Sequence, residues 1–335
     1  MRAIVMTTTG APEVLAPRDL DDPAPAAGQV LVRASAVPVL YPETKVRAGA
    51  FPFPAPLPAV FGFQAAGTIV DLGAGVDPAL LGARVVAATS GFGAYAELVA
   101  ADQDSVTLIP DGLGTESAAA IQMPGSVALA LIATAALTPG ETVLVEAGAT
   151  GVGSCLVQLC AARGVRVIAT AGGPGKAALA RAHGAAAVLD HATPDWADRL
   201  GEVLSGGTVD VVFDSIGGES LTPLLDHVTP LRGRILSYGW LAGAPAQLGA
   251  ADLVLRGLTL TGCAGAAWLG TVAGRRSAAL DAAARGLLSV DIDATLPLDA
   301  AAEAHRKLED RAAFGAVLLR PQPIEAASSE TLSVA

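Results

Sequence analysis

The chain contains few of the residues that build metal clusters, disulfide frameworks or aromatic cores. Among 335 residues there are three cysteines and four histidines, and aromatic residues make up 4%. So sparse and odd a set of cysteines excludes a disulfide scaffold and suits a reduced, cytoplasmic protein. Cys155 and Cys160 lie five positions apart in a segment of helical character, a spacing unsuited to a structural metal cluster. The core must therefore consist mainly of Ala, Val and Leu.

Positive charge and long apolar runs are also scarce. Lys and Arg number 21 against 32 Asp and Glu, which gives a formal net charge of −11. An acidic surface repels phosphate backbones, so no nucleic-acid partner is expected, and any anionic ligand needs a local positive pocket. The first apolar run, 3–6, is too short for a signal peptide. Longer apolar stretches are interrupted by charges or turn formers, so no membrane span is expected either.

Up to about residue 121 the chain is rich in proline and glycine and has only short apolar runs. The clearest are 29–34, 67–72 and 83–87, each bounded by glycine or proline. This pattern is typical of the short strands of an irregular barrel. Segment 51–58 has a proline at every second position. We expect a surface loop there, bordering a cleft, because proline removes the donors that helices and central strands need.

Beyond residue 121 the pattern changes to apolar strands that alternate with helices. Such an alternation predicts a parallel sheet covered on both faces. The predicted strands are 142–145, 165–170, 187–189, 209–213, 234–238 and 258–261, and the predicted helices are 153–163, 174–183, 277–285 and 300–308. We therefore expect an α/β protein with an irregular barrel, a doubly wound Rossmann sheet and a C-terminal return. Residues after about 321 are small and polar, which predicts a disordered tail.

The sharpest motif is the strand–turn–helix at 143–153, which reads Val-Leu-Val-Glu-Ala-Gly-Ala-Thr-Gly-Val-Gly. The pyrophosphate of a dinucleotide must approach the backbone closely, which only small residues permit. The helix N-terminus then offers free N–H groups and the positive end of its dipole. The second strand at 165–170 supplies the required βαβ context. An ordinary tight turn remains open, but dinucleotide binding is the favoured interpretation.

The end of the second strand indicates which dinucleotide binds. NAD-binding domains usually place Asp or Glu about 20 residues after the first glycine, where it accepts a hydrogen bond from the ribose 2′-hydroxyl. Residues 169–176 read Ala-Thr-Ala-Gly-Gly-Pro-Gly-Lys and contain no carboxylate. Small residues leave room for a 2′-phosphate, and Lys176 supplies a compact positive charge, unless it is only a solvated helix lysine. The sequence favours NADPH over NADH.

Taken together, these segments resemble the medium-chain dehydrogenase/reductase superfamily, specifically its zinc-free quinone oxidoreductase (zeta-crystallin-like) and enoyl reductase branch. The resemblance covers nearly the whole chain, and the order and spacing of its segments carry it. Besides the turn, the matching segments are 61–69 (Phe-Gly-Phe-Gln-Ala-Ala-Gly-Thr-Ile), 93–97 (Gly-Ala-Tyr-Ala-Glu), 213–218 (Phe-Asp-Ser-Ile-Gly-Gly), 233–239 (Gly-Arg-Ile-Leu-Ser-Tyr-Gly) and 304–309 (Ala-His-Arg-Lys-Leu-Glu).

The resemblance implies a GroES-like substrate domain formed by 1–121 and 288–322, a Rossmann NADP-binding domain at 122–287 and a tail at 323–335. It also implies a homodimer. By position, Lys176 is identified as the 2′-phosphate lysine, with Arg311 and His191 beside the cofactor phosphates. Lys176 and Arg311 would provide the positive pocket that an acidic protein needs. The full set expected to bind NADP(H) is Ala149, Thr150, Gly151, Val152, Gly172, Lys176, His191, Ser215, Ile216, Ser237, Tyr238, Gly239, Cys263 and Arg311.

The ligand sets of the zinc-dependent relatives are missing. Those relatives carry a Cys-Gly-Thr-Asp-type segment, a Gly-His-Glu segment and a four-cysteine lobe. Here 38–44 and 62–64 contain neither cysteine nor histidine, and 76–121 contains no cysteine, which predicts no metal site. Without zinc to polarise a carbonyl, conjugate reduction is the easier chemistry. Hydride adds to the β-carbon, hydrogen-bond donors stabilise the enolate oxygen, and water or a side chain supplies a proton.

The substrate end departs from the family pattern. Where relatives commonly have asparagine, tyrosine and threonine, this chain has Leu40, Phe51 and Val127. Together with Phe53 these residues predict an apolar cleft for a small hydrophobic carbonyl compound. Tyr41 is the candidate catalytic donor to the substrate oxygen, although a packed aromatic is equally open.

The other titratable residues receive ordinary roles. Glu43 and Lys45 could form an acid/base pair, but a solvated loop pair is favoured, and His183, His227 and His305 are expected at surface or capping positions. The leading hypothesis is an NADPH-dependent reductase of quinones or α,β-unsaturated carbonyls, with a tailoring enoyl reductase of secondary metabolism as a close variant. A cofactor-binding non-redox protein, cyclase or isomerase on the same fold is the alternative.

Overall fold

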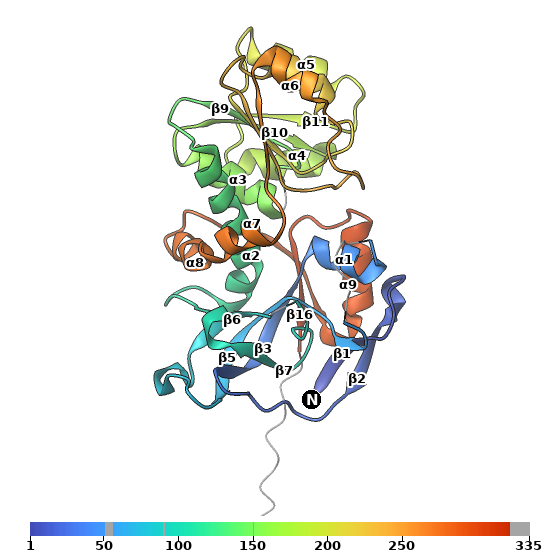
Figure 1. Cartoon of the computed structure of the whole chain (residues 1–335), viewed down its shortest axis with the longest axis vertical. Coiled ribbons are helices and arrows are strands. Elements are labelled where there is room, and N and C mark those ends of the chain that lie inside the picture. The colour runs from blue at the N-terminus through green and yellow to red at the C-terminus, as the bar shows by residue number, and fades with distance from the viewer. Residues whose placement is uncertain (51–55, 90, 150, 322–335) are drawn as a thin grey trace, which may run out of the picture.

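The computed structural model describes residues 1–50, 56–89, 91–149 and 151–321. Two lobes follow one another along the long axis of the molecule, and each is built on its own sheets (Figure 1). The expected irregular barrel and the expected parallel sheet are both present. Phe51, Phe53, Thr150 and the predicted tail at 323–335 lie outside the described residues.

The lower lobe in Figure 1 combines both ends of the chain. One sheet has the strand order β2-β1-β4, and the other has the order β15-β16-β3-β5-β6-β8, with β7 also paired to β3. The C-terminal strand β16 pairs antiparallel with β3, which brings Leu318 opposite Pro38. The strands of this lobe are β1 (Arg2–Met6), β2 (Leu15–Asp19), β3 (Gln29–Val39), β4 (Ala59–Val60), β5 (Gln64–Leu72), β6 (Arg84–Ala88), β7 (Leu98–Asp102), β8 (Val106–Leu108), β15 (Ile292–Pro297) and β16 (Ala316–Arg320).

Short helices complete this lobe. Helix α1 (Tyr41–Ala48) starts with Pro42 in its first turn and ends at Gly49, whose φ of 76° allows the left-handed cap. Helix α9 (Ala301–Glu309) packs beside α1 (Figure 1). Short 3₁₀ helices lie at Pro12–Val14, Pro78–Leu80, Gln103–Ser105 and Leu298–Ala300, and a further one, in the upper lobe, at Thr222–His227.

The upper lobe is a six-stranded parallel sheet with the order β11-β10-β9-β12-β13-β14. The order runs outward in both directions from β9, as a doubly wound fold requires. Residues 143–145 and 211–213 of its central strands are buried and apolar, which is why these strands were recognisable in the sequence. The elements are β9 (Thr142–Val145), α3 (Gly151–Ala161), β10 (Arg166–Ala171), α4 (Gly173–Ala182), β11 (Ala187–Asp190), α5 (Trp196–Leu204), β12 (Val211–Asp214), β13 (Arg234–Ser237), α6 (Ala250–Arg256), β14 (Thr259–Gly262), α7 (Ala266–Ala273) and α8 (Arg276–Ala284).

A long helix, α2 (Thr115–Ala135), belongs to both lobes. Its first half packs Ala118 and Ala119 against barrel residues, and its second half packs Leu131 and Ile132 into the core of the parallel sheet. Within the described residues α2 is the one helix long and apolar enough to cross a membrane, but 72% of its most apolar stretch is buried in the protein. It therefore serves as a core helix, and the boundary predicted at residues 121 and 122 falls inside it.

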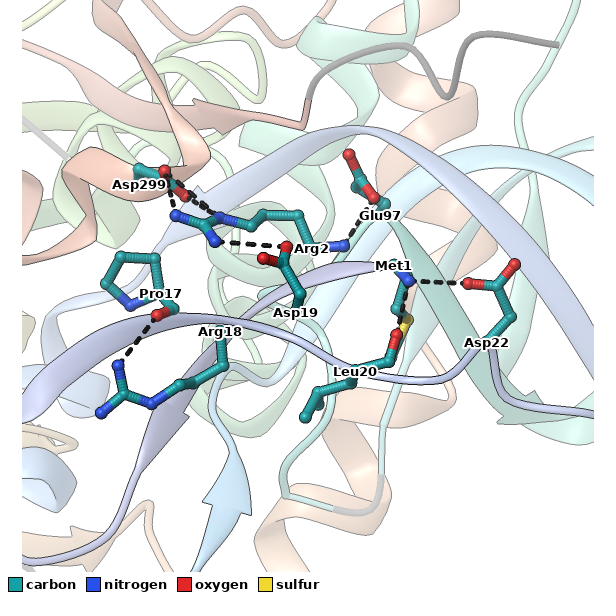
Figure 2. Close-up of polar contacts among 9 residues, drawn as sticks. All are labelled: Met1, Arg2, Pro17, Arg18, Asp19, Leu20, Asp22, Glu97 and Asp299. Carbon is teal, nitrogen blue, oxygen red and sulfur yellow. Dashed lines mark hydrogen bonds and ion pairs between the residues drawn. The ribbon is translucent and has the colours of Figure 1, made fainter. Parts of the chain in front are cut away.

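Hydrogen bonds and ion pairs join Met1 and Arg2 to the rest of the lower lobe (Figure 2). The Arg2 guanidinium donates to Asp299 at 2.8 Å and to Asp19 at 3.2 Å, and the Arg2 backbone N–H donates to Glu97 at 2.6 Å. The amino group of Met1 donates to Asp22 at 2.8 Å. Asp299 belongs to the C-terminal return, so these contacts join both chain ends. A cavity of about 490 Å³ at this place is lined by three carboxylates beside Met1 and Arg2, whose positive groups are already paired with aspartates, which disfavours an anionic cofactor.

Candidate active site

The turn between β9 and α3 is built without room for side chains. A Cβ added to Gly153 would lie 2.2 Å from the carbonyl oxygen of Ala147, and one added to Gly148 would lie 2.7 Å from the Cβ of Ala169. Gly151 opens α3 with a φ of 55° and is exposed to solvent. The helix N-terminus therefore faces solvent over a bare backbone, which is the arrangement that accepts a pyrophosphate.

Three basic residues that are distant in sequence meet beyond the end of β10. Lys176 Nζ donates to the carbonyl oxygen of Arg311 at 2.7 Å, and the Arg311 guanidinium donates to the carbonyl of Leu241 at 3.0 Å. His191 Nδ1 lies 3.1 Å from Thr170 Oγ1, and a Cβ on Gly172 would lie 3.3 Å from its Nε2.

The electrostatics of this basic set favour an anion. Burial lowers the pKa of Lys176, and the charge of Arg311 lowers it further. Burial likewise lowers the pKa of His191; Arg311 and Lys176 add to the effect, while Asp190 opposes it. Arg311 thus raises the positive potential at both Lys176 and His191, and a bound phosphate would offset that potential. Together with the open turn, the set fits NADP(H), whose 2′-phosphate Lys176 and Arg311 would hold.

The carboxyl edge of β12 and β13 gathers another part of the predicted cofactor site. The Ser237 hydroxyl donates to Asp214 Oδ2 at 2.6 Å, and the Cys263 N–H donates to the Ser237 carbonyl at 2.8 Å. A Cβ on Gly239 would lie 2.9 Å from the carbonyl oxygen of Ser215, so glycine is needed for this close approach. Ser215, Ser237, Gly239 and Cys263 therefore lie at the same edge of the sheet; their contact with the cofactor stays a prediction.

A buried pair of carboxyl groups supports this edge from behind. Glu146 directly follows β9 and has 1% of its surface exposed, and Asp214 ends β12 with none exposed. Asp214 Oδ1 accepts from the backbone N–H groups of Ile216 at 3.1 Å and Gly217 at 2.8 Å. Burial, and then its hydrogen bond with Asp214, raise the pKa of Glu146 well above its ordinary value. Glu146 therefore keeps its proton, and the backbone around Ile216 is held by Asp214.

Two of the four predicted cleft residues are described. Leu40 directly precedes α1 and Val127 lies on α2, and both are partly exposed. The Tyr41 ring stacks with Lys45, whose Nζ lies 5.0 Å from the ring centroid. Tyr238 packs, partly buried, against the core of the parallel sheet, and Val152 does the same from α3.

Comparison with known proteins identifies the family. Residues 26–111 match the model of the alcohol dehydrogenase GroES-like domain, and residues 151–283 match that of the zinc-binding dehydrogenases. A quinone oxidoreductase of Pseudomonas aeruginosa is 33% identical over 325 residues, which cover 96% of this chain and 99% of that protein. A 2-haloacrylate reductase of a Burkholderia species is 31% identical over 96% of this chain and 99% of its own length. The structure of Escherichia coli quinone oxidoreductase complexed with NADPH has a TM-score of 0.88 at 31% identity, covering 96% of this chain and 100% of that one.

This chain is a medium-chain dehydrogenase/reductase of the quinone oxidoreductase branch. The two family models also confirm the fold class, a GroES-like domain joined to a Rossmann sheet. In this reductase, no three His, Cys, Asp or Glu side chains gather as a possible metal site within the part of the chain that the structure describes.

Two expectations about the reductase were wrong. Glu43 and Lys45 form neither an acid/base pair nor a solvated loop pair, because Glu43 lies in α1 with no exposed surface. Its carboxylate accepts from the Tyr95 hydroxyl at 2.7 Å instead. His305 is no surface or capping residue either: it is fully buried, with its Nε2 3.1 Å from the Tyr95 hydroxyl oxygen. Sequence reasoning did not single out Tyr95, although it belongs to a segment that carries the family resemblance.

Proposed function

We propose that this reductase transfers hydride from NADPH to the activated double bond of a quinone or an α,β-unsaturated carbonyl compound. As a member of its branch it is an NADPH-dependent oxidoreductase. The single observation that carries the choice of cofactor is the assembly of Lys176, Arg311 and His191 beyond a strand whose end has no carboxylate. When bound, NADPH supplies the hydride; the protein must hold the acceptor and its developing charge.

The substrate end supports a hydrophobic acceptor. Leu40 and Val127 offer apolar side chains, and Tyr41 offers a hydroxyl at the N-terminus of α1. The names of the relatives suggest acceptors to try, namely quinones and 2-haloacrylate. Loss of NADPH absorbance should follow with at least one quinone, enone, haloacrylate or enoyl thioester. A folded, NADPH-binding protein inert toward the whole panel would contradict the proposal, and turnover of enoyl thioesters alone would favour a tailoring enoyl reductase.

Tyr41 is the residue we propose as donor to the substrate oxygen. Replacing Tyr41 with Phe removes the hydroxyl and should lower kcat by about 100-fold, the effect of removing one oxyanion donor. The dissociation constant for NADPH, measured by fluorescence, should stay unchanged because Tyr41 belongs to the other lobe. An unchanged kcat would instead show that Tyr41 is a packed aromatic.

We also propose that the reductase is a homodimer joined through β14. This strand lies at the end of the sheet order, so among the described residues no strand pairs with one side of its backbone. Exposed apolar side chains lie on β14 itself and in segments next to it in the chain or hydrogen-bonded to one: Leu231, Val254, Leu255, Leu260 and Leu269. A second copy can pair antiparallel with β14 across a two-fold axis and cover these side chains. Light scattering should show a dimer. Replacing Leu260 with Pro should give a folded monomer, because the N–H groups of Thr259 and Cys263 donate to β13 and that of Leu260 therefore faces the free edge. A monomeric parent protein would contradict this interface.

A cytoplasmic location stays a prediction, supported by three cysteines that are all unpaired and buried.

A further inference from the structure

A buried chain of polar side chains runs from the N-terminus of α1 to α9. Glu43, Tyr95 and His305 have no exposed surface. The Tyr95 hydroxyl donates to Glu43 Oε2 at 2.7 Å and lies 3.1 Å from His305 Nε2. Buried polar groups are costly unless they are paired, and each of these three side chains has a hydrogen-bond partner within the chain.

Glu43 connects two backbone segments at the substrate end. Its Oε2 also accepts from the N–H of Leu40 at 2.7 Å, and its Oε1 accepts from the N–H of Phe63 at 2.8 Å. Leu40 is the predicted cleft residue and directly precedes Tyr41, the proposed donor. Both carboxylate oxygens are therefore used to fix this corner of the lobe against the segment before β5.

Burial and Arg47 keep the His305 ring neutral. The Arg47 guanidinium is 2% exposed and is paired with Glu309 at 2.5 Å. Burial, together with the charge of Arg47, lowers the pKa of His305 to about 3. A neutral imidazole has one N–H, and the single Tyr95 hydroxyl hydrogen is donated to the Glu43 carboxylate. The Tyr95 oxygen is left to accept, which assigns the His305 proton to Nε2 when Glu43 is ionised.

We propose that Glu43 is a positioning residue for the proposed reduction: its carboxylate, oriented by Tyr95 and His305, holds Leu40 and Tyr41 at the substrate, and its protonation releases them. The catalytic part of this inference rests on the proposed function, whereas the ionisation of Glu43 does not. Once protonated, Glu43 has an O–H where it had an acceptor, so one of its three donors loses its partner. The titratable or charged groups around the chain are Tyr95, His305, Arg47, Glu309, Lys45 and Glu13.

The balance of forces places this protonation near neutral pH. Burial raises the pKa of Glu43 to about 7, while the hydrogen bonds from Leu40, Tyr95 and Phe63 lower it. Removing one of these donors must therefore raise the pKa further. If Tyr95 only filled space beside Glu43, its replacement would not raise the pKa of Glu43. The midpoint of the Glu43 titration is therefore the deciding observation.

The first measurement follows Glu43 without any turnover. The backbone amide proton shifts of Leu40 and Phe63, followed by NMR, should titrate together with a midpoint near pH 7. The midpoint should move to higher pH with Tyr95→Phe and disappear with Glu43→Gln. The control variant Glu303→Gln removes an exposed carboxylate from α9 and should leave the midpoint unchanged. If Glu43→Gln fails to fold, Tyr95→Phe still decides. Absence of the titration, or a midpoint unmoved by Tyr95→Phe, would overturn the role of Glu43.

The second measurement links that titration to catalysis. With an enone that the enzyme reduces, kcat/KM should rise with increasing pH and have the same midpoint as the amide titration. In Tyr95→Phe this midpoint should shift to higher pH. Glu43→Gln should raise KM for the acceptor about 10-fold, remove the transition and leave the dissociation constant for NADPH unchanged. A pH profile of kcat/KM whose midpoint differs from that of the amide titration would overturn the positioning role. A parent protein inert toward every acceptor would overturn the proposed function, and the catalytic part of the inference with it, while the amide titration would still decide the state of Glu43.

Discussion

The cofactor end and the substrate end of this reductase each bury a glutamate, and the two are accommodated in opposite ways. Glu43, at the substrate end, receives hydrogen bonds from two backbone N–H groups and the Tyr95 hydroxyl. Glu146, at the cofactor end, faces the carboxyl group of Asp214. Three donors favour a carboxylate, whereas a second carboxyl group favours retention of a proton.

The difference reflects how each end is built. The cofactor end depends on bare backbone, where Gly148 and Gly153 leave no space for a Cβ, and Glu146 behaves as a neutral support behind it. The substrate end depends on a chain of side chains in which the charge of Glu43 itself holds the backbone. Titration should therefore affect the substrate end near neutral pH and spare the cofactor end.

The largest effect is expected where bare backbone matters most. Replacing Gly153 with Ala places a Cβ against the carbonyl of Ala147 and should lower the free energy of unfolding by about 3 kcal/mol. It should also weaken NADPH binding, because α3 must move. The matched control is Gly270→Ala on α7, where a Cβ meets nothing within 4 Å and should stabilise by about 0.5–1 kcal/mol. Equal unfolding energies for both variants, by urea denaturation, would refute the tight turn.

The two glutamates give the next largest effect. An amide at position 43 has one acceptor oxygen, so either the Leu40 or the Phe63 N–H loses its partner. Glu43→Gln should therefore lower the free energy of unfolding at pH 8 by about 2 kcal/mol. Glu146→Gln should change it by less than about 1 kcal/mol, because an amide and a protonated carboxyl both donate to Asp214. Similar losses in both variants would erase the contrast between the two ends.

The smallest effect concerns the basic set. Replacing Lys176 with Ala should weaken NADPH binding about 10-fold, or about 1.4 kcal/mol, and leave NADH binding nearly unchanged, because only NADPH carries the 2′-phosphate. Arg181→Ala removes an exposed charge from the same helix and controls for the loss of general positive potential. An equal loss of NADH affinity would show that Lys176 does not contact the 2′-phosphate.

Much of the fold could be predicted from the sequence because its strands and helices are specified by residues that are close together in the chain. The strand predicted at 142–145 is found as Thr142–Val145, and the predicted helix 174–183 is found as Gly173–Ala182. Helix α2 was not predicted, since its nearly uniform apolar sequence shows no periodicity and contains Pro124. Helix α1 was overlooked because a short charged segment next to a proline-rich stretch is typical of a loop.

The same distinction between local and distant contacts decides which residues of the candidate site could be predicted. The turn at 147–153 and Lys176 could be named because their chemistry lies within one βαβ unit. The partners of Glu43 could not, because Phe63 and Tyr95 lie 20 and 52 residues away, and His305 lies 210 residues beyond Tyr95. Only the folded chain brings them together, and burial then changes the protonation of side chains that look ordinary in the sequence.

The most direct test of the central claim is the fate of the transferred hydrogen. The reductase would be given NADPH that carries deuterium at both positions of nicotinamide C4, together with an α,β-unsaturated carbonyl acceptor. The product would be analysed by NMR and mass spectrometry. Hydride transfer predicts one deuterium at the β-carbon of every product molecule. Product formed without deuterium would contradict it and would favour cyclase or isomerase chemistry on this fold.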